Sequence, residues 1–203
     1  MRLPTIAVVS SSLSPVSRSR LGARRAEHRL REWGLPTRWI DLADLHFEAY
    51  PRSEADSDLQ RACGQFNTAD GWLIATPVYN FNISGTLLTF LHYALAGDAG
   101  ERWKPFCLLA SMDGLRAGLA LDHLGRTLQH ERGAVAVGPP LIGIGEQLDI
   151  RTGRTSPEMS DRMDRSLRAL VHYSRARLTL DEWEDPMVTL PGVSAPEGRN
   201  STR

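Results

Sequence analysis

Short apolar runs alternate with longer stretches of helical periodicity along most of this chain. The most continuous run, Gly71 to Ala75, contains no polar side chain, which is typical of a strand buried on both faces. Similar runs predict further strands at residues 6–9, 37–40, 105–110 and 134–137. Apolar residues spaced three and four apart predict helices at residues 19–33, 57–67, 84–93, 116–131 and 159–177.

Polar, glycine and proline residues predict where several helices begin and end. Ser84 is an N-cap for the helix that follows the central strand, and Ser160 is among the caps for the final one. Gly34 and Pro36 end the first helix. In the helix at 116–131, four leucines are expected to point inward: Leu119, Leu121, Leu124 and Leu128.

The alternation of strands and helices predicts an α/β fold in which parallel strands are joined by right-handed crossovers. Five strands at this spacing fit a flavodoxin-like three-layer sandwich, with a five-stranded parallel sheet of order 2-1-3-4-5. We expect residues 1–180 to form one domain. Residues 181–203 hold three prolines and no periodicity, so we expect a tail that is flexible or packed on a neighbour.

Composition narrows the class of protein. The 203 residues carry no formal net charge and have a pI of about 7.0, so no global field favours nucleic acid or an anionic membrane. No apolar run approaches the roughly 20 residues that cross a bilayer, and no signal-peptide core follows the first residues. We therefore expect a cytoplasmic protein, with Cys63 and Cys107 as buried free thiols.

Three loops at the carboxyl edge of the sheet carry the candidate chemistry. Residues 10–20 include six serines before a helix N-terminus, which is a natural cradle for a phosphate. Pro77 to Ile83 provides proline, aromatic and amide groups for a flat ligand, and Ser111 to Gly114 forms a third loop. The alternatives are serines that only cap the helix and a hairpin-like loop packed by its own side chains.

Other uses of such loops lack their motifs. The sequence contains no P-loop, no G-x-G-x-x-G after the first strand, and no G-x-S-x-G before a helix. No acidic pair follows the first strand, and the six histidines show no metal-binding spacing. A loop suited to a phosphate together with a loop suited to a flat ring predicts FMN as the ligand.

Two motifs give the chain a resemblance to the NAD(P)H-dependent FMN reductase family of flavodoxin-like proteins. Residues 8–20, VVSSSLSPVSRSR, resemble the family's phosphate loop, and Thr76-Pro77-Val78-Tyr79-Asn80 followed by Ser84-Gly85 resembles its T-P-E-Y-N…P-G signature. The resemblance implies an FMN-dependent enzyme that takes hydride from NADPH or NADH. It implies no catalytic side chain. The implied cofactor-binding residues are Ser12, Ser14, Ser17, Arg18, Ser19, Pro77, Val78, Tyr79, Asn80, Ser111 and Asp113.

The chain departs from the family pattern at several positions. Ser11 and Val16 stand where the family usually has glycine, and Ser14 replaces an arginine whose charge Arg18 or Arg20 would have to supply. The resemblance also implies a homodimer or homotetramer and a flavin, quinone or other aromatic acceptor, with a flavin-dependent monooxygenase as one partner. A non-catalytic FMN-binding protein or electron carrier, or a degenerate family member with altered activity, remains the alternative.

Overall fold

Five parallel strands form the centre of the molecule, which we describe from a computed structural model over residues 2–46, 48, 57–96, 103–112, 118–143 and 145–180. The sheet has the order β2-β1-β3-β5-β6, which confirms the predicted flavodoxin-like order once β5 and β6 are counted as the fourth and fifth strands. The main strands are β1 (Ile6–Ser10), β2 (Thr37–Asp41), β3 (Gly71–Tyr79), β5 (Pro105–Ser111) and β6 (Val135–Ala136).

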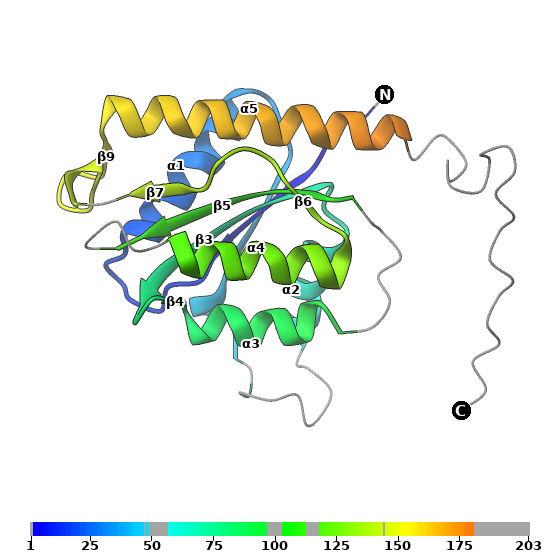
Figure 1. The fold of residues 1–203 in the computed structure, drawn as a ribbon, viewed down its shortest axis with the longest axis horizontal. Helices are drawn as coiled ribbons and strands as arrows, with labels where there is room; N and C mark the ends of the chain where they lie inside the picture. Colours follow the sequence, from blue (N-terminus) through cyan, green and yellow to red (C-terminus); the bar gives the residue numbers. More distant parts are fainter. Residues whose placement is uncertain are drawn as a thin grey trace, which may run out of the picture.

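Helices cover both faces of this sheet (Figure 1). One apolar cluster joins the sheet to α1 (Arg18–Glu32) and α5 (Pro157–Leu180). A second cluster, with Phe66 stacked on Trp72 at 4.3 Å between ring centroids, joins the other face to the remaining helices. Those helices are α2 (Ser57–Asn67), α3 (Gly85–Ala94) and α4 (Gly118–Arg132). The continuous apolar strands are therefore buried on both sides, as their composition predicts.

The edge next to β5 differs from the prediction. The predicted single strand at residues 134–137 is the short β6, and β7 (Leu141–Gly143) pairs with β5 further along. Two prolines at positions 139 and 140, with Gly138 at φ +82°, interrupt the ladder between these two segments. Because proline has no N–H to donate, the fifth strand is divided into two pieces.

Two predictions about helices are also corrected. Leu119 is 73% exposed because it lies about 200° around α4 from Leu121, whereas the other three predicted leucines are buried. The last helix begins at Pro157, and Ser156 caps it by accepting a hydrogen bond from Met159 N–H at 3.1 Å. Proline favours the first helical position, so the helix starts two residues earlier than its apolar pattern indicates.

Small elements complete the carboxyl edge of the sheet. Strand β4 (Asn82–Ile83) pairs antiparallel with the end of β3, and a 3-10 turn, η1 (Leu42–Asp44), follows β2. After β7, η3 (Gly145–Gln147) leads into a hairpin of β8 (Leu148–Asp149) and β9 (Arg154–Thr155). Leu148 of this hairpin fills the space that Gly143 leaves open.

Asp70 joins three elements at the opposite, amino edge of the sheet. Its carboxylate accepts hydrogen bonds from Arg2 at 2.6 and 2.7 Å and from Thr5 N–H at 2.7 Å, and Arg177 lies 4.0 Å away. Burial acts to raise the pKa of Asp70, but these hydrogen bonds and positive charges outweigh it, so the pKa lies below its ordinary value.

Candidate functional site

Side chains from three adjacent strands project to one face at the carboxyl edge. Strand alternation puts Ser10 on the same face as Ile6 and Val8, which pack toward α1. By the same argument Pro77 and Tyr79 share a face with Leu73, and Ser111 with Leu109, both in that cluster. Pro77 and Ser111 are direct neighbours in the ladder. The strand ends that lead into the three predicted loops therefore share the α1 side of the sheet.

The first loop ends at α1 with two serine hydroxyls. Ser17 is the N-cap, and its Oγ accepts a hydrogen bond from Arg20 N–H at 3.2 Å. Ser17 Oγ also lies 3.0 Å from Ser19 Oγ, so one hydroxyl donates to the other and one proton stays available for a further acceptor. The first turn contains no acidic residue, so no carboxylate opposes an anion at the positive end of the helix dipole.

Ser10 has the one serine hydroxyl oxygen that is itself buried at this edge without a hydrogen-bond partner among the described residues. Its side chain is fully buried at the end of β1. A buried hydroxyl without a partner is costly, and such a group calls for an explanation. Sequence reasoning included Ser10 in the serine loop without singling it out, although its even position along β1 already places it on the α1 face.

Arg20 stabilises the conformation of the first loop. Its guanidinium donates to Asp41 Oδ2 at 2.9 Å and to Oδ1 at 3.3 Å, and also to the carbonyl oxygens of Ser12 and Ser14. These bonds commit Arg20 to the loop backbone rather than to a ligand. Arg18, the other predicted source of charge, is half-buried in the first turn of α1.

Ser11, Thr76 and Ser84 form a second hydroxyl cluster on the opposite face of the sheet. Ser84 Oγ lies 2.9 Å from Ser11 Oγ, and Ser84 N–H donates to Thr76 Oγ1 at 3.2 Å. Ser84 also caps α3 through Leu87 N–H, as predicted. Ser11 replaces the family's glycine without obstructing the α1 face, because its side chain joins the first loop to the start of α3.

The second loop is a tight hairpin, which was the alternative interpretation of its sequence. Asn80 and Phe81 occupy its two central positions at φ +49° and +63°, the left-handed region that two-residue hairpins require. Tyr79 and Phe81 are 56% and 50% exposed, and Asn80 is exposed. Val78 is instead buried in the α3-side core, so only its backbone faces the edge.

The remaining predicted residues differ in their burial and in their hydrogen-bond partners. Ser12 is buried, and its Oγ accepts from Ser14 N–H at 3.3 Å, while Ser14 Oγ donates to Val16 O at 2.8 Å. Ser111 is buried at the end of β5. Asp113 and Gly114 lie outside the described residues.

Neither free cysteine lies at this edge. Cys107 is buried in β5 and Cys63 is half-buried in α2. Burial raises the pKa of Cys107 to about 12 and that of Cys63 to about 11, so both stay protonated thiols at neutral pH. The described residues contain no group of three potential metal ligands.

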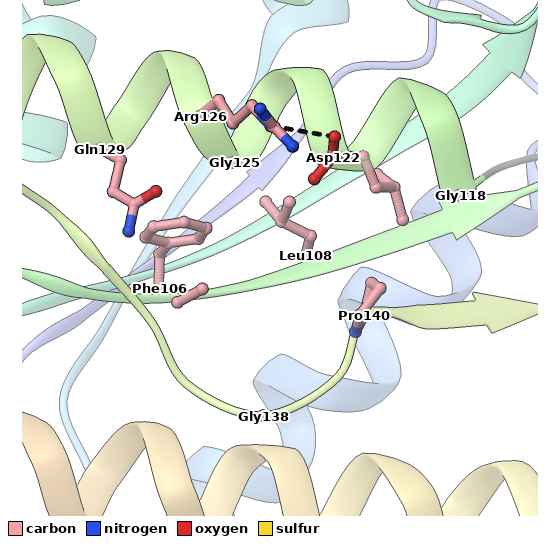
Figure 2. Close-up of a pocket in the computed structure, with 11 residues that line it drawn as sticks. Phe106, Leu108, Gly118, Asp122, Gly125, Arg126, Gln129, Gly138 and Pro140 are labelled. Carbon is pink, nitrogen blue, oxygen red and sulfur yellow. Dashed lines mark hydrogen bonds and ion pairs between the residues drawn. The ribbon is translucent and has the colours of Figure 1, made fainter.

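A separate pocket of about 240 Å³ lies where the fifth strand is divided (Figure 2). Phe106 and Leu108 of β5 form its floor, and α4 covers it with the ion pair between Asp122 and Arg126 at 3.0 Å. None of the predicted cofactor-binding residues that the structure describes lines it. The polar groups at the ends of β1, β3 and β5 are therefore separate from this pocket.

A parallel sheet with a hydroxyl-rich loop after its first strand and an aromatic hairpin after its third defines a flavodoxin-like protein. The model of the NADPH-dependent FMN reductase family matches residues 4–149, and the chain belongs to this family. It is an oxidoreductase, and the cofactors of this class of enzyme are FMN and NAD(P)H. No curated protein sequence matches it.

Solved structures agree with this assignment. An NADH:FMN oxidoreductase (EMOB) in its apo form is 26% identical with a TM-score of 0.64, over 85% of this chain and 89% of that one. The flavoenzyme NAD(P)H:(acceptor) oxidoreductase FerB from Paracoccus denitrificans has a TM-score of 0.70 at 20% identity, over 86% and 98%. An oxidoreductase from Corynebacterium diphtheriae has a TM-score of 0.67 at 22% identity, over 87% and 98%. The last two establish the fold alone.

Proposed function

We propose that this protein binds FMN on the α1 face of the carboxyl edge and reduces a flavin, quinone or other aromatic acceptor at the expense of NAD(P)H. The hydroxyls of Ser12, Ser17 and Ser19, with Arg18, hold the phosphate. Pro77, Tyr79, Asn80 and the backbone of Val78 flank the ring system. Ser111 reaches the pyrimidine side of the ring, with Ser14 and Asp113 contributing to the two outer loops.

The observation that carries this assignment is the convergence of donors on one face. The hydroxyl of Ser10 is buried without a partner among the described residues, and the Ser17–Ser19 pair keeps one proton for an outside acceptor. The Ser17–Ser19 pair lies where α1 begins, and the dipole of this helix favours an anion. Because Pro77 and Ser111 are adjacent on the same face, a phosphate at α1 leaves space for a ring along the strand ends.

The redox chemistry belongs to the cofactor when it is bound, and no side-chain nucleophile is required. The reaction removes two electrons and one proton from NAD(P)H, and a quinone acceptor gains these together with one proton from solvent. The chain itself binds and orients the cofactor. Tyr79 offers an exposed aromatic surface beside the ring, and the loop N–H groups stabilise negative charge at the polar end of the ring.

We further propose that the enzyme acts in the cytoplasm as a homodimer or homotetramer. Within the described residues no helix is long and apolar enough to cross a membrane. Trp103 is 65% exposed and provides apolar surface for such an interface, whereas Phe47 and Tyr50, two further aromatic residues that the sequence offers for it, lie outside the described residues. A reductase that releases reduced flavin would supply a flavin-dependent monooxygenase, and one that retains flavin would reduce a quinone.

Anaerobic titration of the purified protein with NADPH and FMN tests the proposal, followed by a panel of flavin and quinone acceptors. We expect NADPH oxidation that depends on FMN. Ping-pong kinetics with retained flavin would assign the quinone reaction. Tyr79→Ala should weaken FMN binding, whereas the similarly exposed control Tyr173→Ala should not. Absence of NADPH oxidation with every acceptor would refute the proposal.

A further inference from the structure

The hairpin of β3 and β4 has a turn whose backbone conformation is unfavourable for its sequence (Figure 1). Asn80 and Phe81 occupy its two central positions at φ +49° and +63°. Asparagine tolerates the left-handed region because its short polar side chain can hydrogen-bond locally. A bulky side chain is strained there, and two-residue turns of this kind favour glycine at the second position. The chain therefore carries a phenylalanine where a glycine would make the turn more stable.

Burial in the core does not account for this phenylalanine. Phe81 is 50% exposed, whereas the core residues Phe66 and Phe90 are 0% exposed. The free energy gained on burial scales with the apolar area that is removed from water, so Phe81 gains only part of what a core phenylalanine gains. The side chain must serve a purpose other than filling the core.

The base of the hairpin imposes the strained turn. Val78 and Ile83 form a cross-strand pair, and both are buried, at 8% and 7% exposure. Directly after this pair, Ser84 N–H donates to Thr76 Oγ1 at 3.2 Å. These contacts fix both strands and leave two residues to close the turn. Strained residues persist where the surrounding structure determines their conformation in this way, and they are common at ligand-binding sites.

Phe81 enlarges the aromatic surface at the carboxyl edge. Tyr79, two residues earlier in the same hairpin, is 56% exposed. Among the exposed tyrosine, phenylalanine and tryptophan residues that the structure describes, these two alone lie at this edge. Trp103 precedes β5, and Tyr173 lies in the second half of α5. Tyr79 is the last residue of β3, whereas Phe81 lies in the turn beyond it, where a second molecule approaches from solvent.

We propose that Phe81 contacts the electron acceptor and selects a flat, fused-ring quinone, whereas Tyr79 contacts the cofactor. This inference rests on the proposed function. An aromatic side chain beside a stacked acceptor stabilises the stack and holds it in a reactive orientation. The quinone becomes a quinol by gaining the two electrons and the proton that NAD(P)H loses, together with one proton from solvent. The turn is less stable than a glycine turn because it presents a ring to the acceptor.

Steady-state kinetics of Phe81→Gly with two acceptors tests the proposal. 2-Methyl-1,4-naphthoquinone can stack on a ring, whereas ferricyanide, which takes up one electron per ion, cannot. We expect kcat/KM for the naphthoquinone to fall about five-fold and that for ferricyanide to stay unchanged. Phe81→Tyr should keep the native values, as should the control Tyr173→Ala, which removes a ring that is 53% exposed on α5. An unchanged ratio of the two kcat/KM values in Phe81→Gly would overturn the proposal.

Two further measurements do not depend on turnover. Phe81→Gly should raise the urea midpoint of unfolding by about 0.3 M because strain is relieved, and Asn80→Gly should raise it less. A lower midpoint for Phe81→Gly would show that the ring is retained for folding and would contradict the proposal. The dissociation constant for FMN should stay within about two-fold of the native value, which is a change of less than about 0.5 kcal/mol. A larger loss would assign Phe81 to the cofactor instead.

The remaining outcomes separate this inference from the function on which it rests. A native protein that oxidises NADPH with neither acceptor would refute the proposed function and this inference with it. A native protein that is active with both acceptors, and whose activity Phe81→Gly leaves unchanged, would refute this inference alone. A change in the mass of the assembly in Phe81→Gly would place the ring at a subunit interface and also contradict the proposal.

Discussion

Replacing Arg20 with methionine tests whether the guanidinium shapes the first loop. Arg20 and Asp41 are 20% and 7% exposed at their side chains, so water reaches this pair only partly. Among the described residues, the substitution leaves the Asp41 carboxylate with only the Ala43 N–H as a donor at 3.2 Å, and two loop carbonyls lose the guanidinium as their donor. Removing one partner of a buried ion pair costs about 3–5 kcal/mol, and partial exposure reduces this to about 3 kcal/mol.

Urea unfolding of Arg20→Met, Asp41→Asn and the double variant measures this cost. Asp41→Asn keeps the acceptor for Ala43 N–H and should lose about 1–2 kcal/mol. The double variant should lose less than the sum, with a coupling of about 1–2 kcal/mol. FMN affinity should fall with Arg20→Met because the loop loses its shape. A loss of unfolding free energy below about 0.5 kcal/mol for Arg20→Met, or strictly additive losses in the double variant, would refute the role of Arg20 in shaping the first loop.

Three further predictions concern the body of the fold. Asp70→Asn should destabilise the protein at pH 7, and this cost should shrink as the pH falls below about 3.9: a depressed pKa contributes stability that is fully present above the ordinary pKa and is lost as the pH falls through the folded pKa. Gly22→Ala should cost about 1 kcal/mol of stability in urea unfolding, because the new Cβ would lie 2.9 Å from a β5 leucine methyl. Gly64→Ala should instead stabilise the protein, because its Cβ would meet nothing within 4 Å. Cys63 and Cys107 should resist thiol reagents at pH 8 until urea is added, since their pKa values are about 11 and 12.

The strands, the helices and their alternation follow from the sequence because apolar periodicity encodes burial directly, and the strand order follows from the fold class that this alternation fits. A hairpin is one of the two interpretations of residues 77–83, but its turn at Asn80 and Phe81 does not follow from the sequence, since phenylalanine seldom adopts positive φ and two-residue turns favour glycine there. Nor does the divided fifth strand, whose second half follows two prolines.

Hydrogen bonds between residues that are distant in sequence could not be predicted from the sequence pattern either. Asp41 and Arg20 are 21 residues apart, and Ser11 and Ser84 are 73 apart. Each side chain has a local explanation, as a cap or as a loop residue, so nothing in its neighbourhood indicates the remote partner. Only the folded sheet brings their loops together. Val78 follows the alternation of β3, so its side chain is in the core and its backbone faces the edge.

The affinity of the native protein for FMN compared with riboflavin tests the central claim most directly, because the two differ only by the phosphate. Equilibrium titration should give one FMN per chain, bound at least about tenfold more tightly than riboflavin, which corresponds to about 1.4 kcal/mol for the contacts at the start of α1. Ser19→Ala should reduce that ratio. Equal affinities for the two ligands, or no binding of either, would contradict a phosphate site at the serine loop.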